Sequence, residues 1–153
     1  HHGNGTQDIF YTRGDVLFCS VHRYGWPFFP GTGGPEEQGH GDGEGCTLNV
    51  PLRPGDGDAE IVAAVRDVII PRVEAFAPDL VLLSAGYDAH RLDPLGGLAV
   101  SDDGYRQLVR LTADLAARTS DGRLVAVLEG GYHPGALARC VADTVEQLDR
   151  ILG

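Results

Sequence analysis

The segment "PDLVLLSAGYDAHRLDPLGG", residues 78–97, decides the fold of this chain. Its first half is a continuous apolar run, which is typical of a strand in a parallel sheet that helices cover on both faces. Its second half carries Asp88, His90 and Asp93. In open parallel sheets, binding sites lie beyond the carboxyl ends of the strands. The segment therefore predicts a buried strand followed by a functional loop.

The segments on either side alternate between helix and strand. Apolar residues recur at three- and four-residue intervals in three of them, which predicts helices. Pro71 is expected to kink or restart the helix over residues 58–76, and Ser101 is expected to cap the helix over residues 101–119. A second apolar run predicts another buried strand, so the pattern indicates parallel α/β architecture. The expected helices are residues 58–76, 101–119 and 134–152, and the second strand lies in residues 123–131.

The first third of the chain is rich in loops. We expect one clear strand at residues 15–22 and a short one at 46–52. Glycines alternate with other residues from Gly39 to Gly45, but a phosphate-binding loop should open a helix. This stretch runs into a strand instead, which favours an ordinary surface loop.

Composition narrows the function further. The net charge of −10 argues against broad nucleic-acid binding and would favour a cationic substrate. No apolar run is long enough to span a bilayer, so no membrane role is expected. The three cysteines form no CxxC pair and indicate reduced thiols in a cytoplasmic protein rather than a cysteine-based zinc site. The chain contains no Met and no Lys, a bias typical of a GC-rich bacterial genome.

Polar residues follow three strands where the chain leaves the predicted sheet. The strand expected at residues 15–22 ends in Ser20 and His22. Asp88 follows the apolar run in residues 78–97, and Tyr132 follows the strand in residues 123–131 after a Gly-Gly pair. Singly, each has a structural explanation, such as capping a loop or packing as a half-buried aromatic. Together with His1, they form a set of His, Asp and Tyr side chains that suits a hard metal ion and a bound substrate.

Four ordered motifs carry a resemblance to a known family. They are "HHGNGTQDIFY" (1–11), "SVHRYGWPFFPGTGG" (20–34), "PDLVLLSAGYDAHRLDPLGGL" (78–98) and "VLEGGY" (127–132). The chain resembles the histone deacetylase family, the zinc-dependent group that includes acetoin-utilisation proteins and acetylpolyamine amidohydrolases. The resemblance implies the arginase/deacetylase fold, an α/β fold in which helices flank an eight-stranded parallel sheet. This chain is similar to its C-terminal part.

The resemblance also assigns roles to residues. His1 matches a histidine zinc ligand, so the His-His start is not expected to be a tag remnant, and His2 is not expected to bind the metal. Asp88 matches an aspartate zinc ligand. Tyr132 matches the tyrosine whose hydroxyl polarises the amide carbonyl. Phe29 and Leu95 match positions that line the acyl-lysine channel, and Ser20 and Val21, with the backbone of His1, match a structural potassium site.

Two parts of the family's machinery have no counterpart in this chain. The other aspartate ligand would lie two residues before His1, and the tandem histidines of the general acid/base would lie earlier still. We therefore expect residues 1–153 to be the C-terminal part of a single catalytic domain. Alone, this part should be inactive, with an apolar edge or face of its incomplete sheet uncovered.

The implied function is zinc-dependent removal of acetyl or longer acyl groups from acyl-lysine, acetylpolyamines or small acylated amines by metal-activated water. A non-catalytic domain that binds acyl-lysine or a protein partner on the same fold is the alternative, and the presence of Tyr132 and Asp88 favours the enzyme. An arginase-like dimanganese hydrolase would need an Asp-x-Asp pair near Asp88, which "DAHRLD" (88–93) does not supply.

Overall fold

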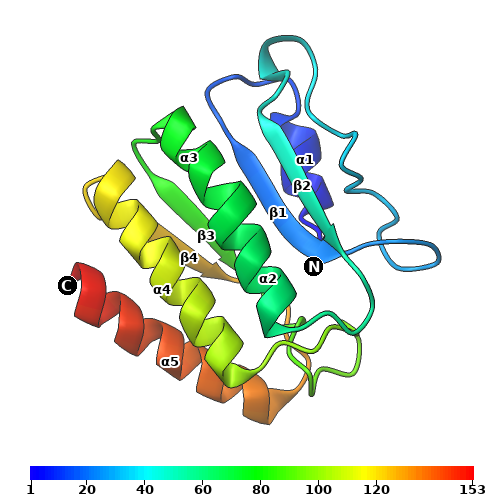
Figure 1. Cartoon of the computed structure of the whole chain (residues 1–153), viewed down its shortest axis with the longest axis vertical. Helices are drawn as coiled ribbons and strands as arrows, with labels where there is room; N and C mark the ends of the chain where they lie inside the picture. The colour runs from blue at the N-terminus through cyan, green and yellow to red at the C-terminus, as the bar shows by residue number, and fades with distance from the viewer. The chain divides into compact units, whose positions relative to one another are not determined.

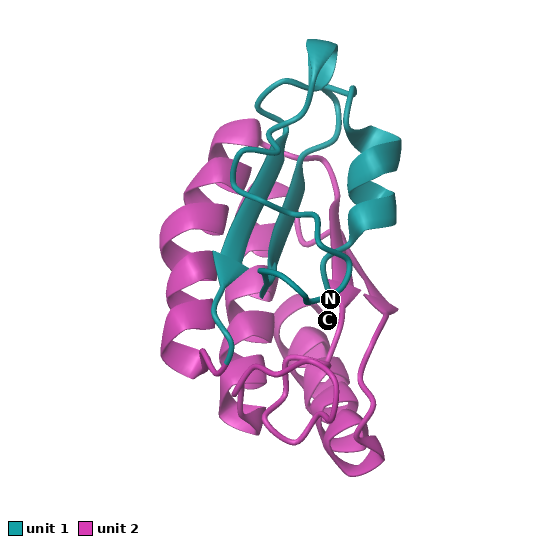
Figure 2. Ribbon diagram, turned by 90° about the vertical axis from the view of Figure 1, so that its right-hand side faces the viewer, with its two compact units in different colours: residues 1–54 teal, residues 55–153 magenta.

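The structure is a computed structural model that describes residues 1–153. Contacts divide the chain into two compact units, His1–Pro54 and Gly55–Gly153, which are coloured separately in Figure 2. None of the helices combines the length and the apolar character needed to cross a membrane.

Unit 1 is built around two parallel strands, β1 (Phe18–Arg23) and β2 (Thr47–Leu52) (Figure 1). They pair in register from Phe18 opposite Thr47 to Arg23 opposite Leu52. Both expected strands are confirmed, although β1 begins at Phe18 rather than Asp15. The unit also contains a short 3₁₀ helix, Gly41–Gly43, and helix α1 (Asn4–Phe10), which the sequence did not predict.

In unit 2, the expected helix over residues 58–76 forms as three consecutive segments. They are α2 (Asp58–Ala64), a π-helical turn (Val65–Ile69) and α3 (Ile70–Phe76). Pro71 has no backbone N–H and cannot continue the ordinary i→i−4 pattern, so the extra-residue turn just before it accommodates the break. The predicted disturbance at Pro71 is confirmed.

The other helices and strands of unit 2 follow the predicted alternation. Strand β3 (Val81–Ala85) pairs in parallel with β4 (Leu124–Leu128), and helices α4 (Asp102–Thr119) and α5 (Pro134–Leu152) follow them. Figure 1 shows α4 between the α2–α3 segment and α5, and α4 packs against both. The buried face of α4 carries residues at helical spacing: Tyr105, Val109, Ala113 and Ala116. The parallel α/β architecture is confirmed.

The apolar strands of unit 2 are not covered on both faces. Leu82 of β3 is 69% exposed, and Val125 and Val127 of β4, which share its face of the sheet, are 48% and 51% exposed. The prediction of coverage on both faces is therefore wrong for this chain, whereas the prediction of an uncovered apolar face is confirmed. Large exposed apolar patches are typical of protein contact sites.

Ser101 caps α4 as predicted and connects it to α2. Its hydroxyl oxygen accepts from the Gly104 N–H (3.1 Å), and its hydroxyl donates to Asp58 Oδ2 (2.5 Å). The Ser101 N–H donates to the other oxygen of the same carboxylate. A Cβ at Gly104 would lie 2.1 Å from Asp58 Oδ1, so the close approach requires glycine there.

We expect Ser101→Ala to lower the free energy of unfolding by about 1–2 kcal/mol, because it removes the cap of α4. Thermal or chemical denaturation of the full-length protein measures this change. Gln107→Ala is the control, because Gln107 is exposed on the same helix and removing its side chain should stay within about 0.5 kcal/mol. Equal effects from both variants would contradict the capping role.

Candidate functional site

Asp88 and Tyr132, the two predicted site residues that follow β3 and β4, both lie against Gly130. A Cβ on Gly130 would lie 3.4 Å from the Asp88 Cγ and 3.5 Å from the Tyr132 hydroxyl oxygen. The two groups therefore lie no farther apart than the sum of these distances. Asp88 is 7% exposed, whereas Tyr132 is 57% exposed. The unit thus brings a buried carboxyl and an accessible phenol together over a position without a side chain.

This proximity follows from the pairing of β3 with β4. Parallel strands in register end at the same edge, so the loops that follow them meet. Backbone hydrogen bonds continue past the strands: Glu129 N–H donates to Ala85 O (3.1 Å), and Tyr87 N–H donates to Gly130 O (2.7 Å). Gly131 has φ of 139°, which side-chain-bearing residues rarely adopt, and this turn directs the chain to Tyr132.

The loop after β3 folds back closely on Asp88. A Cβ on Gly96 would lie 1.6 Å from the Asp88 carbonyl oxygen, so this contact requires glycine. His90, which is 1% exposed, stacks its ring on that of Tyr105 (6.2 Å between centroids, 16° between planes). Burial raises the pKa of Tyr105, so its phenol stays neutral at all ordinary pH values. The loop that carries Asp88 is therefore held in place by packed aromatic rings.

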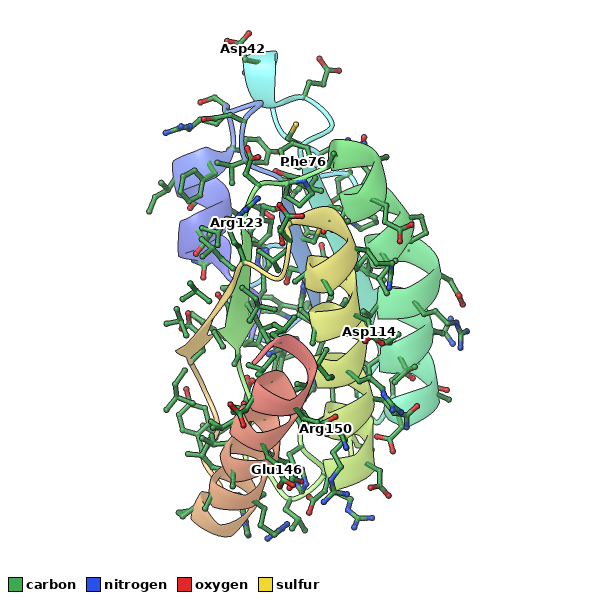
Figure 3. The ribbon with its side chains drawn as sticks, turned by 90° about the vertical axis from the view of Figure 1, so that its left-hand side faces the viewer. Asp42, Phe76, Asp114, Arg123, Glu146 and Arg150 are labelled. Atoms are coloured by element: carbon green, nitrogen blue, oxygen red, sulfur yellow. The ribbon has the colours of Figure 1, made fainter.

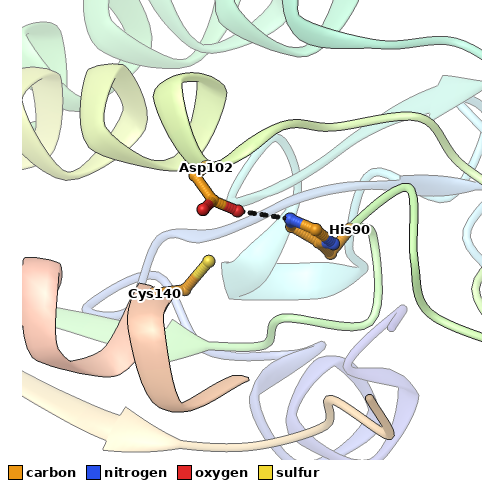
Figure 4. Close-up of side chains that lie close together, drawn as sticks. All are labelled: His90, Asp102 and Cys140. Atoms are coloured by element: carbon orange, nitrogen blue, oxygen red, sulfur yellow. Dashed lines mark hydrogen bonds and ion pairs between the residues drawn. The ribbon is translucent and has the colours of Figure 1, made fainter. Parts of the chain in front are cut away.

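His90, Asp102 and Cys140 lie close together and resemble a metal site by composition (Figure 4). Their potential ligand atoms lie within 4.8 Å of one another. The Leu92 N–H donates to His90 Nδ1 (3.1 Å), which leaves the ring proton on Nε2, and Nε2 donates to Asp102 (2.7 Å). Both ring nitrogens are thus engaged, and neither offers a lone pair to a metal.

Of the other two members of this group, Asp102 is occupied by two donors and Cys140 keeps its proton. Arg139 of α5 donates to Asp102 (2.8 Å), and this bond, with that from His90, lowers the pKa of the Asp102 carboxyl. Burial raises the pKa of Cys140 to about 11, and Asp102 adds to the shift. A thiol that keeps its proton is a poor metal ligand. We interpret the group as a brace that fastens the loop after β3 to α4 and α5.

His1, in unit 1, has the hydrogen-bonding pattern of a metal-binding histidine. Its Nε2 lies 2.9 Å from the backbone oxygen of Arg23, and because a carbonyl can only accept, Nε2 carries the proton. Nδ1 is then the nitrogen whose lone pair suits a metal, and a backbone carbonyl on the other nitrogen is the usual support for such a ligand. Its ring packs edge-on against Phe28 (4.5 Å between centroids).

His2 and His22 are held in a buried polar network instead. His2 contacts Gln7 through Nε2 (3.0 Å) and Thr32 through Nδ1 (3.2 Å), so both its nitrogens are occupied. His22 donates from Nε2 to the Gly33 carbonyl (3.0 Å). Burial lowers the pKa of His22 to about 4, and His2 lowers it further, so the ring stays neutral near pH 7. This is consistent with the expectation that His2 does not bind the metal.

The network extends to α1 and explains why sequence periodicity missed that helix. Gln7, the buried residue of α1, pairs with Glu37 and accepts from the Asn49 side chain (2.8 Å). Tertiary hydrogen bonds stabilise α1, since it is short and its N-cap Gly3 offers no side chain.

The remaining predicted residues have varied surroundings. The hydroxyl of Ser20 donates to His22 Nδ1 (2.8 Å), and Val21 lies beside it in β1. Phe29 in unit 1 and Leu95 in unit 2 are 74% and 60% exposed. Two large apolar side chains with this exposure can contact an apolar ligand.

Sequence reasoning noted Asp93 beyond β3 but gave it no role. Its carboxylate accepts from the Tyr132 N–H (2.6 Å) and from the N–H groups of Leu95 and Gly96 (2.8 and 3.0 Å). The signal in the sequence was the Asp-Pro pair, which is typical of a turn start, but the bond to Tyr132 spans residues far apart in the chain. Asp102, at the start of α4, was likewise given no role.

Comparison with known proteins identifies the family. A profile of the histone deacetylase domain matches residues 1–148. The chain is 49% identical over 132 residues to a probable deacetylase of Archaeoglobus fulgidus, covering 86% of this chain and 36% of that protein. It is 40% identical over 151 residues to a histone deacetylase-like amidohydrolase of Pseudomonas aeruginosa, covering 99% and 40%.

A solved structure agrees with these relatives. The acetylpolyamine aminohydrolase from Burkholderia pseudomallei matches with a TM-score of 0.89 and 36% identity, covering 100% of this chain and 43% of that one. The chain thus spans less than half the length of the relatives that it matches. The family profile, the identity to these relatives and the shared α/β fold together show that the chain belongs to the histone deacetylase family.

Proposed function

We propose that this chain is the C-terminal part of a single catalytic domain that hydrolyses acyl amides with zinc. The observation that carries the proposal is that the Asp88 carboxyl and the Tyr132 hydroxyl both lie against the same position on Gly130. A buried carboxylate is a suitable metal ligand, and an accessible phenol is a suitable hydrogen-bond donor to a carbonyl oxygen.

The residues of this chain fit zinc. His1 and Asp88 would bind it, with a further aspartate from the preceding part of the domain. Imidazole and carboxylate ligands with an open position are typical of catalytic zinc. When bound, zinc would polarise the amide carbonyl and lower the pKa of a bound water. Arg23 would hold the His1 ring in the tautomer that presents Nδ1. Ser20 and Val21, with the His1 backbone, would hold a structural potassium ion.

Tyr132 would act on the substrate itself. Its hydroxyl would donate a hydrogen bond to the oxygen of the scissile carbonyl, where negative charge develops as the amide is attacked. Gly130 and Gly131 allow the amide to approach, because neither carries a side chain. Phe29 and Leu95 would contact the apolar stem of the acylated amine. The net charge of −10 would attract a cationic substrate such as a lysine-rich peptide or a polyamine.

The uncovered apolar face of β3 and β4 supports the proposal that more of the domain is needed. We infer that the preceding part of the full-length protein covers Leu82, Val125 and Val127, and that it supplies the proton-transferring histidines. This chain alone would then bind zinc weakly and would not turn over substrate. We place the full-length protein in the cytoplasm, because the three cysteines of this chain are unpaired.

The test is hydrolysis by the full-length protein. We expect it to release acetate from an acetyl-lysine peptide or an N-acetylated polyamine, to lose this activity with a chelator, and to regain it with zinc. The faster of the two substrates identifies the class. Peptide binding without acetate release, with zinc present, would instead support a non-catalytic acyl-lysine-binding domain.

A further inference from the structure

We propose that Asp93 is a positioning residue for Tyr132, holding the phenol in place from the neighbouring loop. The proposal rests on the proposed role of the Tyr132 hydroxyl. Asp93 Oδ2 accepts from the Tyr132 N–H at 2.6 Å, which connects the loop after β3 directly to the loop after β4. Tyr132 is more than half exposed, so packing alone cannot fix its backbone.

The Asp93 carboxylate is itself held in place. Its Oδ1 accepts from the N–H groups of Leu95 and Gly96, and the Asp93 N–H donates to the His90 carbonyl (2.7 Å). Three N–H donors therefore converge on one side chain. Only a carboxylate can accept on both oxygens, and hydrogen bonds to a charged acceptor are stronger than neutral ones.

His90, the residue to which Asp93 is bonded, is itself held by hydrogen bonds to the helices. His90, whose carbonyl accepts from Asp93, is buried and donates to Asp102 at the start of α4, and Arg139 of α5 donates to the same carboxylate. Asp93 is thus attached to two helices through the brace of His90 and Asp102. Because the brace is bonded to both helices, the helices determine where the loop that holds the Tyr132 backbone lies.

On the other side, Tyr132 is followed directly by the cap of α5. The His133 Nδ1 accepts from the Ala136 N–H (3.1 Å), which fixes the residue after Tyr132. Before Tyr132, Gly131 has a positive φ that residues with side chains rarely adopt, and a Cβ on Gly131 would lie 3.0 Å from Leu137 Cδ1. Asp93 therefore supplies the restraint at the one residue of this turn that carries the reactive hydroxyl.

Asp93→Asn tests the proposal, because asparagine keeps the size of the side chain but replaces one acceptor oxygen with an N–H₂ donor. In the full-length protein, we expect kcat to fall by about 10–100-fold, since small misplacement of a reacting group costs on this order. KM and zinc content should change little. Asp114→Asn is the matched control on exposed α4 surface (Figure 3), and it should leave kcat unchanged.

A double-mutant cycle separates positioning from general loss of structure. If Asp93 acts through the Tyr132 hydroxyl, Asp93→Asn should lower kcat no further in a Tyr132→Phe background. Multiplicative losses in the double variant, or unchanged kcat in Asp93→Asn alone, would overturn the proposal.

An NMR measurement tests the contact independently of catalysis. In the parent protein, the Tyr132 amide proton should resonate downfield and exchange slowly with solvent, because a carboxylate accepts it. In Asp93→Asn, both signatures should be lost, while the Ala136 amide keeps its protection. If the Tyr132 amide does not respond, the inference is wrong even if Tyr132 is catalytic. If it responds but Tyr132→Phe keeps full activity, the proposed function is wrong instead.

Discussion

Asp88→Ala in the full-length protein should remove most of the bound zinc and nearly all deacylation. The carboxylate is buried at the end of β3, and alanine offers no ligand atom in its place. Loss of a hydrogen-bonded neighbour of a metal ligand already costs about 10–100-fold in affinity or activity. Loss of the ligand itself should exceed that. Metal analysis of the purified protein and acetate release measure the two effects.

The control for this prediction is Cys140→Ala. Cys140 belongs to the other group of potential ligands, with His90 and Asp102, which we interpret as a brace. Removing its thiol should leave zinc content near that of the parent. Stoichiometric zinc in Asp88→Ala together with zinc loss in Cys140→Ala would show that the metal binds at the brace. Far-ultraviolet circular dichroism of both variants confirms that each remains folded.

Tyr132→Phe should lower kcat by about 10²–10³-fold, the usual cost of losing one donor to a developing oxyanion. The change deletes only the hydroxyl and keeps the exposed ring, so folding should be unaffected. Zinc content should stay at the parent value, because Tyr132 is not a proposed ligand. Steady-state kinetics with saturating substrate, alongside metal analysis, measure both quantities.

Tyr11→Phe is the matched control, because it makes the same chemical change in the loop after α1, in unit 1. Its kcat should equal that of the parent. If Tyr132→Phe also deacylates at the parent rate, Tyr132 is only a surface aromatic, and the proposed mechanism is wrong.

Local sequence information was sufficient for most of the helices and strands. The apolar runs that became β3 and β4 predicted strands because continuous apolar runs are typical of parallel sheets, even though this chain leaves one of their faces exposed. Ser101 and Pro134 mark the starts of α4 and α5 because capping and fixed φ act within one turn of the chain. The position of Asp88 beyond β3 follows from the same local pattern.

Local patterns failed where distant contacts stabilise the structure. Helix α1 depends on Gln7, whose partners Glu37 and Asn49 come from elsewhere in unit 1. The exposure of Leu82 could not be predicted from the local sequence either, because burial depends on which other segments are present rather than on the strand's own composition.

By itself, the sequence determined the parallel α/β architecture, the family resemblance and the predicted roles of His1, Asp88 and Tyr132, since each lies in a contiguous motif. Only the tertiary structure decided how Asp88 and Tyr132 share the space over Gly130 and how Asp93 holds the Tyr132 backbone. It also decided that His90 belongs to a brace, because its protonation pattern depends on Leu92 and Asp102 together. Hydrogen bonds between separate loops depend on the pairing of β3 with β4, so no single stretch of sequence encodes them.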